Sequence, residues 1–240
     1  MLSPFARSRH DGARQRPPAD ADTDVGFDLD AAEIRVLGVL IEKAFVTPDT
    51  YPMSINAIVT GCNQLTAREP VMSLSEAEVQ AAIDSLIGRR LVARRDQASA
   101  RVAKYEHLVR LRHSLPPAEQ AVLATLMLRG AQTAGELRQR CERLHRFDDI
   151  AAVDAVLEHL AEKYPPLVTS LPRAPGTKEV RHAHLLGGQA AVAEMAESQH
   201  GGGSAGGRGR IAELEDEIRR LREDFDQLRR EFDIFRQQFD

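Results

Sequence analysis

Tryptophan is absent from the 240-residue sequence, and aromatic residues make up only 5% of it. Aliphatic side chains must therefore fill the interior, and a single-stranded nucleic acid would find few rings on which to stack its bases. Apolar runs are also short, and none reaches the roughly 18 residues that a transmembrane helix needs. The N-terminus lacks the apolar segment of a secretory signal. These absences exclude a membrane-spanning helix and predict a cytoplasmic protein.

Cysteine is scarce, which limits metal and redox chemistry. Cys62 and Cys141 each stand alone, without the second cysteine of a metal-binding knuckle. Both lie within apolar helical patterns, so we expect buried, unreactive thiols in a reducing compartment. His182 and His184 alternate along an expected strand, but without a recognisable set of further ligands, so solvated histidines are the preferred interpretation.

Sequence motifs of catalysis are missing as well. Serine, histidine and aspartate occur, but not in the context of a nucleophile elbow. Residues 201–209 are rich in glycine, yet they lack the preceding strand and the Gly-Lys-Ser/Thr ending of a phosphate-binding loop. We therefore expect a protein that is not an enzyme and that binds no cofactor or metal.

Neither sign of charge is in large excess. The sequence has 32 lysines and arginines against 36 aspartates and glutamates, which gives a formal net charge of −4. The molecule as a whole would therefore not attract a polyanion. Any binding to nucleic acid must come from a local patch of cations.

The sequence from residue 29 onward predicts three helices and then a hairpin. Asp30 with Glu33, and Ser75 with Glu78, are the capping boxes of a first and a third helix. A short second helix is expected from Ser54. Residues 91–95 and 101–109 are two β-like segments around a polar turn.

The same pattern then repeats. The motif A-E-x-x-V-L-x-x-L occurs at residues 32–40 and again at residues 118–126. Thr133 and Glu136 form another capping box, residues 150–160 carry a further apolar helical stripe, and residues 167–171 and 179–186 predict a second hairpin.

Three helices followed by a hairpin is the layout of a winged helix. We therefore predict a mainly α fold with small β-hairpins (α+β), containing two tandem winged-helix domains at residues 29–112 and 113–187. Their apolar residues are expected to form two compact three-helix cores and to leave no pocket furnished for a reaction. A three-helix bundle with a ragged tail is the alternative.

The remaining segments are assigned by composition and period. We predict a disordered tail at residues 1–28, a flexible Gly-rich linker at residues 188–209 and a parallel coiled coil at residues 210–240. Acidic g positions face arginine e positions of a partner only in a parallel pair, so we expect a homodimer. A trimer, or docking of this helix on the protein's own domains, remains open. The a and d positions that would form the dimer seam are Ile211, Leu214, Ile218, Leu221, Phe225, Leu228, Phe232, Phe235 and Phe239.

Several short motifs are similar to those of one bacterial family. They are Y-P-M-S at residues 51–54, C-N-Q at 62–64, R-E-P-V-M at 68–72, K-Y-E at 104–106, L-R-G-A-Q-T at 128–133 and G-E-L-R at 135–138. With these motifs the chain resembles the YceH family over about residues 30–187. The resemblance implies two winged helices in tandem and a DNA-binding or regulatory role, and it supplies no catalytic residue. Leu65 and Ala67 stand where family members usually carry a lysine and an asparagine, which weakens a phosphate contact by this loop.

Cations on the loop at residue 68 and around the first predicted hairpin are the candidates for DNA contact. Each could neutralise a backbone phosphate. They are Arg68, Arg89, Arg90, Arg94, Arg95, Arg101 and Lys104.

Carboxylates at the start of both expected third helices argue against DNA contact by these helices. Glu76 and Glu78 begin the first of these helices, and Asp148 and Asp149 precede the second. They stabilise the helix dipole but repel phosphate, so neither helix is expected in the major groove. We predict a DNA-binding, transcription-regulator-like homodimer. A winged-helix protein-interaction module that binds another protein and no DNA is the alternative.

Overall fold

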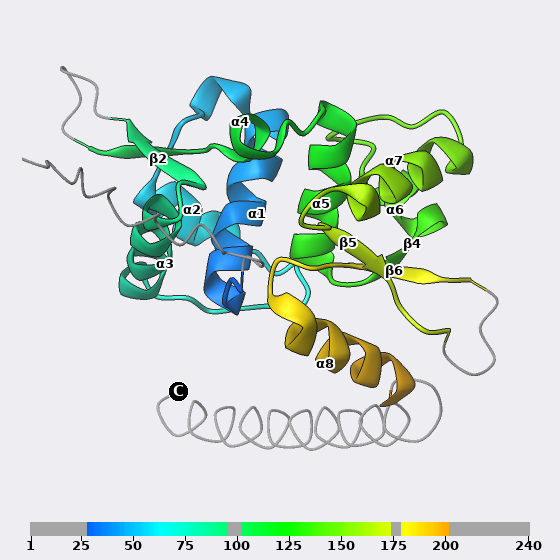
Figure 1. The fold of residues 1–240 in the computed structure, drawn as a ribbon. Coiled ribbons are helices and arrows are strands. Elements are labelled where there is room, and N and C mark those ends of the chain that lie inside the picture. The colour runs from blue at the N-terminus through cyan, green and yellow to red at the C-terminus, as the bar shows by residue number, and fades with distance from the viewer. Residues whose placement is uncertain (1–27, 96–101, 174–178, 202–240) are drawn as a thin grey trace, which may run out of the picture.

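The computed structural model describes residues 28–95, 102–173 and 179–201 (Figure 1). These residues form a mainly helical α+β fold with two small three-stranded antiparallel sheets. In this part of the chain, no helix is both long enough and apolar enough to span a lipid bilayer. The predicted tail up to residue 27 and the predicted coiled coil at residues 210–240 lie outside the described residues.

Two units of similar layout follow one another along the chain. The first unit consists of α1 (Ala31–Val46), the 3-10 helix η1 (Pro48–Thr50), β1 (Met53–Ser54), α2 (Ile55–Cys62), α3 (Glu76–Gly88), β2 (Val92–Arg95) and β3 (Lys104–His107). A connecting helix, α4 (Val109–His113), leads to the second unit. That unit consists of α5 (Pro117–Arg129), β4 (Gln132–Thr133), α6 (Ala134–Arg140), α7 (Ile150–Glu162), β5 (Val168–Ser170) and β6 (Arg181–His184), and α8 (Gly188–Gly201) follows it.

Side-chain caps start the helices where the sequence predicts them. Complete capping boxes are present at Asp30 of α1, Ser75 of α3 and Thr133 of α6, each with a glutamate three residues later. The Ser54 hydroxyl accepts a hydrogen bond from the backbone N–H of Ala57 and caps α2. These bonds satisfy amides that the first helical turn leaves without partners.

Both predicted hairpins are confirmed, and each gains a third strand that the sequence did not reveal. The strand orders are β1-β3-β2 and β4-β6-β5. β1 pairs Met53 with Tyr105, and β4 pairs Gln132 with His182. Both extra strands are only two residues long, too short to show an alternating pattern.

The repeated A-E motif contributes the same ion pair to each unit. Glu33 of α1 is only 4% exposed, and its Oε1 lies 3.6 Å from Nε of Arg89 at the end of α3. Glu119 of α5 is 2% exposed and pairs with Lys163 at 3.1 Å, after the end of α7, and with His159. In both units, a buried carboxylate on the first helix therefore anchors the end of the third helix just before the hairpin.

The two units share one hydrophobic core, which corrects the expectation of two separate cores. Buried residues of both units belong to a single cluster, and α1 packs along α5 at the centre of the molecule (Figure 1). Gly38 allows this approach, because a Cβ there would lie 3.1 Å from the side chain of Leu128. Backbone hydrogen bonds from Leu29 N to Leu186 O and from Glu69 N to Leu128 O, each 2.8 Å, join the units further.

Part of the predicted linker at residues 188–209 is a helix, so this assignment needs correction. α8 covers residues 188–201 and lies next to β6 (Figure 1). Its Val192 is buried in a small cluster with Leu171 and Ala183, and Met195 packs against that cluster. The short apolar stripe of α8 thus gains an apolar surface that only the folded second unit provides. Residues 202–209 lie outside the described residues.

Candidate functional site

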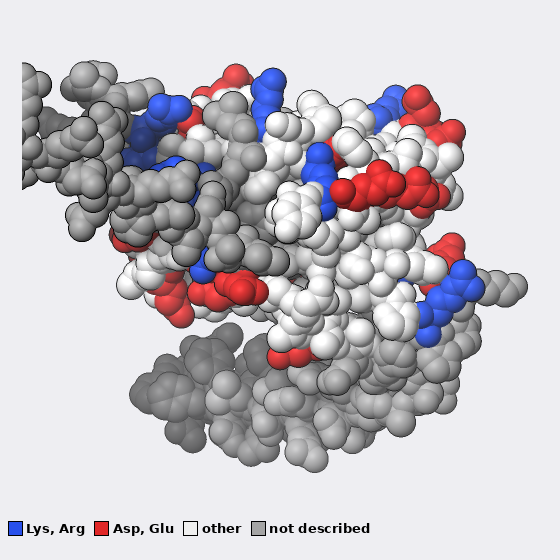
Figure 2. All heavy atoms as spheres, in the orientation of Figure 1, with Lys and Arg blue, Asp and Glu red and all other residues white. Residues whose placement is uncertain are grey.

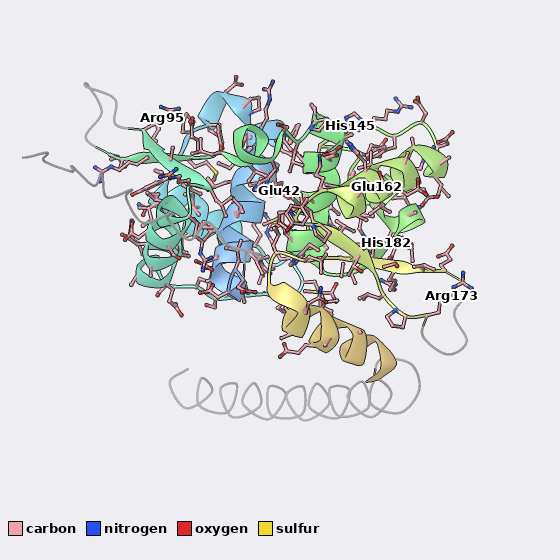
Figure 3. All side chains as sticks on the ribbon, in the orientation of Figure 1. Glu42, Arg95, His145, Glu162, Arg173 and His182 are labelled. Atoms are coloured by element: carbon pink, nitrogen blue, oxygen red, sulfur yellow. The ribbon has the colours of Figure 1, made fainter. Side chains whose placement is uncertain are left out.

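Several predicted DNA contacts gather at the hairpin β2–β3. Arg90, Arg94 and Arg95 are exposed and Lys104 is half-buried, and we call these four residues the basic hairpin. Arg95 lies directly opposite Lys104 in the strand register, so their charges are held close together. Figure 2 shows lysine and arginine atoms over this hairpin, and Figure 3 labels Arg95 there. Arg101 lies outside the described residues.

Arg95 and Arg89, both predicted as DNA contacts, make ion pairs within the protein. Arg95 donates two hydrogen bonds to one carboxylate oxygen of Glu106, at 2.8 and 2.5 Å, although its side chain remains 58% exposed. These hydrogen bonds raise the pKa of Arg95. Arg89 is the partner of buried Glu33, so its role is at least partly structural.

The prediction that Arg68 contacts DNA needs correction, because its side chain is buried and its hydrogen-bond donors bind other groups of the protein. It is 6% exposed, and its guanidinium donates to both carboxylate oxygens of Glu42, at 3.2 and 2.6 Å. Its remaining donors bind the carbonyls of Gly61 and Ala67 and the side-chain oxygen of Gln64. Arg68 fastens the loop after α2 and presents no charge to a polyanion.

The third helix of each unit offers carboxylates and no cations. α3 and α7 contain no lysine or arginine at all. Exposed acidic residues are Glu76, Glu78 and Asp84 on α3 and Asp154, Glu158 and Glu162 on α7. This agrees with the expectation that neither helix enters a major groove, since such a surface repels phosphate.

A hollow of about 430 Å³ lies between the two units, where the sequence predicted no furnished pocket. It is bounded by the end of α1, residues 64–67, the end of α5, and α6 with the turn after it. Four cations and one carboxylate line it, namely Lys43, Arg129, Arg140, Arg143 and Glu42. We call it the interunit pocket. Figure 3 labels Glu42 on α1, next to the second unit.

Glu42 is neutralised inside this pocket. Arg68 binds both of its oxygens, and Lys43 lies 3.3 Å from Oε2. Burial alone would raise the pKa of Glu42, but the hydrogen bonds and charges of Arg68 and Lys43 outweigh it and lower the pKa. Glu42 therefore stays ionised and has no strong tendency to attract further cations.

Arg129 is one of three half-buried cations of the pocket, with Lys43 and Arg140. Among the described residues, its guanidinium has no hydrogen bond and no ion-pair partner within 4 Å. Burial and then repulsion from Arg140 lower its pKa. A second hollow of about 510 Å³ adjoins the pocket and shares Arg129 and Arg140 with it. There Arg181 forms a 3.1 Å ion pair with Glu136.

The short motifs that carry the family resemblance lie on both sides of the interunit pocket. Gln64 lines it from the first unit, and Leu128 and Arg129 line it from the second. The backbone hydrogen bond between Glu69 and Leu128 joins two of these motifs directly. The residues were visible in the sequence, but their convergence depends on the packing of α1 against α5.

The cysteines and histidines do not form a metal centre in the part of the chain that the structure describes, where no group of three or more potential ligands comes together. Cys62 and Cys141 are fully buried, as predicted, and burial raises their pKa values to about 12 and about 11. The prediction of solvated histidines is wrong for His184, which is 2% exposed, and burial lowers its pKa to about 4. His182 is half-buried.

Comparison with known proteins identifies the family. The family described as "Protein of unknown function, DUF480" matches residues 29–177, which cover most of both units. The chain belongs to the DUF480 family. UPF0502 proteins of Aromatoleum aromaticum and of Azoarcus sp. are each 73% identical to it over 202 and 201 residues, covering 83% of this chain and 89% of each relative. A UPF0502 protein of Janthinobacterium sp. is 52% identical over 201 residues, covering 83% of this chain and 86% of that relative. The resemblance to YceH is thereby confirmed at the level of the family, because the DUF480 family includes YceH of E. coli.

Proposed function

We propose that this DUF480 protein is a DNA-binding, transcription-regulator-like protein that acts as a homodimer and contacts the DNA backbone through the basic hairpin. The observation that carries the proposal is the exposure of Arg90, Arg94 and Arg95 around one strand pair, with Lys104 opposite Arg95. Cations held close together on a rigid strand pair can reach neighbouring phosphates of one duplex.

The proposed domains are two winged helices in tandem. The element order of each unit and the strand orders β1-β3-β2 and β4-β6-β5 support this assignment. In a winged helix the hairpin is the wing, which can lie along the DNA backbone beside the helix-turn-helix.

Contact through the wing alone predicts a particular kind of binding. α3 and α7 lack the cations that would bring them to a base edge past the phosphates. Backbone contacts position a protein on DNA but carry no direct sequence information. We therefore expect weakly specific binding whose affinity falls steeply as the salt concentration rises.

The test is a titration of the full-length protein with a generic DNA duplex, followed by fluorescence anisotropy at several salt concentrations. The variant Arg90→Gln/Arg94→Gln should weaken binding at about 50 mM salt by about tenfold or more and reduce the salt slope by about 2 for each hairpin that contacts the duplex. The control Arg110→Gln/Arg146→Gln removes the same charge from exposed residues outside both the basic hairpin and the interunit pocket, and it should bind nearly as well as the wild type.

Two results would contradict the DNA proposal. Absence of binding at low salt would refute it altogether. Equal weakening by the control variant would show that the overall charge, and not the basic hairpin, governs the interaction.

Protein assembly without DNA is the second candidate, and one observation favours it. The exposed faces of α3 and α7 are acidic and free of lysine and arginine, and Ile150 at the start of α7 is 49% exposed. A basic protein partner would suit such faces. If DNA binding is absent, binding to that partner should weaken in the variant Asp154→Asn/Glu158→Gln, which changes only exposed positions.

The homodimer is proposed to form through the coiled coil at residues 210–240. Two basic hairpins in one dimer would bind a duplex more tightly than one, because the second contact forms at a raised effective concentration. Deleting residues 210–240 should halve the mass measured by light scattering. An unchanged mass would exclude this segment as the dimer interface, and a threefold change would indicate a trimer.

A further inference from the structure

The interunit pocket has the size of a small-molecule site. Its volume of about 430 Å³ lies within the range of typical ligand pockets, about 300 to 1,000 Å³. Both units contribute walls, since Lys43 comes from α1 and Arg129 from α5. The pocket is therefore created by the packing of the units and would be lost if they separated.

The charge inside the pocket favours an anion. Its single carboxylate, Glu42, is already bound by Arg68 and Lys43. Arg68 itself lies behind the carboxylate and is not exposed. In the second unit, Arg140 pairs with Glu136, and Arg129 is attracted by the charge of Glu42 without bonding to it. The cations that line the pocket therefore outnumber its carboxylate.

Arg129 supplies the clearest sign of a missing partner. It is half-buried, and within the described part of the chain no acceptor or carboxylate lies within bonding distance of its guanidinium. A half-buried guanidinium loses part of its contact with water, and without a partner this partial loss costs free energy. An oxyanion that accepts two parallel hydrogen bonds would compensate for this cost, because its geometry matches the planar guanidinium.

Arg140 and Arg143 are the other two arginines of the site. Arg140 is held in place by a hydrogen bond to Gln132 and by Glu136 at 3.6 Å. Arg143 is exposed and has no hydrogen-bond or ion-pair partner among the described residues, so it is available to a ligand in the pocket. One ordered arginine and one adaptable arginine thus flank Arg129.

We propose that the interunit pocket binds a small, multiply charged oxyanion, such as the phosphoryl groups of a phosphorylated metabolite, through Arg129, Arg140 and Arg143. The proposal does not depend on DNA binding, because none of these residues belongs to the basic hairpin. These three arginines belong to the second unit, and the opposite wall of the pocket is formed by the end of α1 and residues 64–67 of the first unit. A ligand that fills the pocket would therefore touch both units and stabilise their packing, which provides a route by which a metabolite can act on the whole protein.

The test uses inorganic pyrophosphate as the probe, added to the full-length protein at constant ionic strength, with thermal unfolding and isothermal titration calorimetry as readouts. The wild type should show saturable binding and a rise in Tm of about 5 °C or more at a hundredfold excess over Kd. Arg129→Met should weaken binding at least tenfold, and Arg143→Gln should weaken it severalfold. Arg146→Gln, which changes a nearby exposed arginine outside the pocket, is the matched control and should bind like the wild type.

The variants also separate this site from the basic hairpin. Arg90→Gln/Arg94→Gln should leave pyrophosphate binding unchanged even where it abolishes DNA binding. The proposal is overturned if the wild type shows no saturable response, or if the hairpin variant loses the response and Arg143→Gln retains it. Because Arg143 is exposed and makes no hydrogen bond or ion pair with any residue that the structure describes, its substitution gives a result even if Arg129→Met fails to fold.

Discussion

Lowering the pH from 7 to 5 should destabilise the protein through His184 on β6. This side chain is 2% exposed, and its Nδ1 has no hydrogen-bond partner among the described residues. Burial disfavours the charged imidazolium and lowers the pKa from 6.5 to about 4. Between these two pKa values, His184 is therefore neutral in the folded protein and protonated in the unfolded chain.

The size and direction of the effect follow from the two pKa values. The folded-state pKa is the lower one, so the unfolded state takes up the proton first as the pH falls below about 6.5. The stability is present in full above that pH and is lost progressively towards pH 4. With pKa values of 6.5 and about 4, His184 alone lowers the free energy of unfolding by about 2 kcal/mol between pH 7 and pH 5 and by about 3 kcal/mol in total. Burial also lowers the pKa of His107 to about 4, and the loss that it adds is the same in a variant that lacks only His184.

Urea unfolding at pH 7, 6 and 5 measures this loss. His184→Leu removes the titrating group, so its stability should fall by about 2 kcal/mol less than that of the wild type over the same range. Carboxylates titrate in both proteins and cancel in the comparison. Identical pH dependence in the wild type and His184→Leu would refute the reasoning.

Three further predictions concern the core and the loop after α2. Gly61→Ala should destabilise the protein by about 1 to 3 kcal/mol in urea unfolding, although alanine favours helices, because its Cβ would lie 2.7 Å from Cγ1 of buried Val39. Glu42→Gln should cost about 3 kcal/mol because it leaves the buried Arg68 guanidinium without its counter-charge, and adding Arg68→Met should recover part of the loss; full stability of the single variant would contradict this. Cys62, whose thiol pKa is raised by burial to about 12, should react with a thiol reagent only as fast as the protein opens, and rapid labelling of the folded state would argue against its burial.

Local signals in the sequence were sufficient for the helix starts and the hairpins. A capping box such as Thr133 with Glu136 involves residues three apart, so it can be recognised before any tertiary contact is known. β1 and β4 have only two residues each and depend on a partner strand far along the chain. The single core likewise depends on the fit of Gly38 against Leu128, about 90 residues away, which no local pattern encodes.

Of the candidate sites, the basic hairpin could be predicted from the local sequence, whereas the interunit pocket could not. The cations of the basic hairpin are neighbours in the sequence or across one turn, so their proximity was predictable. Arg68 looked like a free cation because its partner Glu42 lies on a different element. The interunit pocket joins Lys43 to Arg143 across both units, and the solvent exclusion that shifts the pKa of His184 likewise arises only in the folded sheet.

Because α1 packs against α5, neither unit can bury all of its apolar surface without the other. A fragment ending after β3 would leave the α5-facing side of α1 in water, and a fragment beginning at α5 would expose Leu128 where Gly38 now covers it. Each fragment would expose an apolar surface that fits the apolar surface of the other. A break in the backbone near α4 would therefore leave two pieces that recognise each other, so that the intact chain resembles a covalently joined heterodimer.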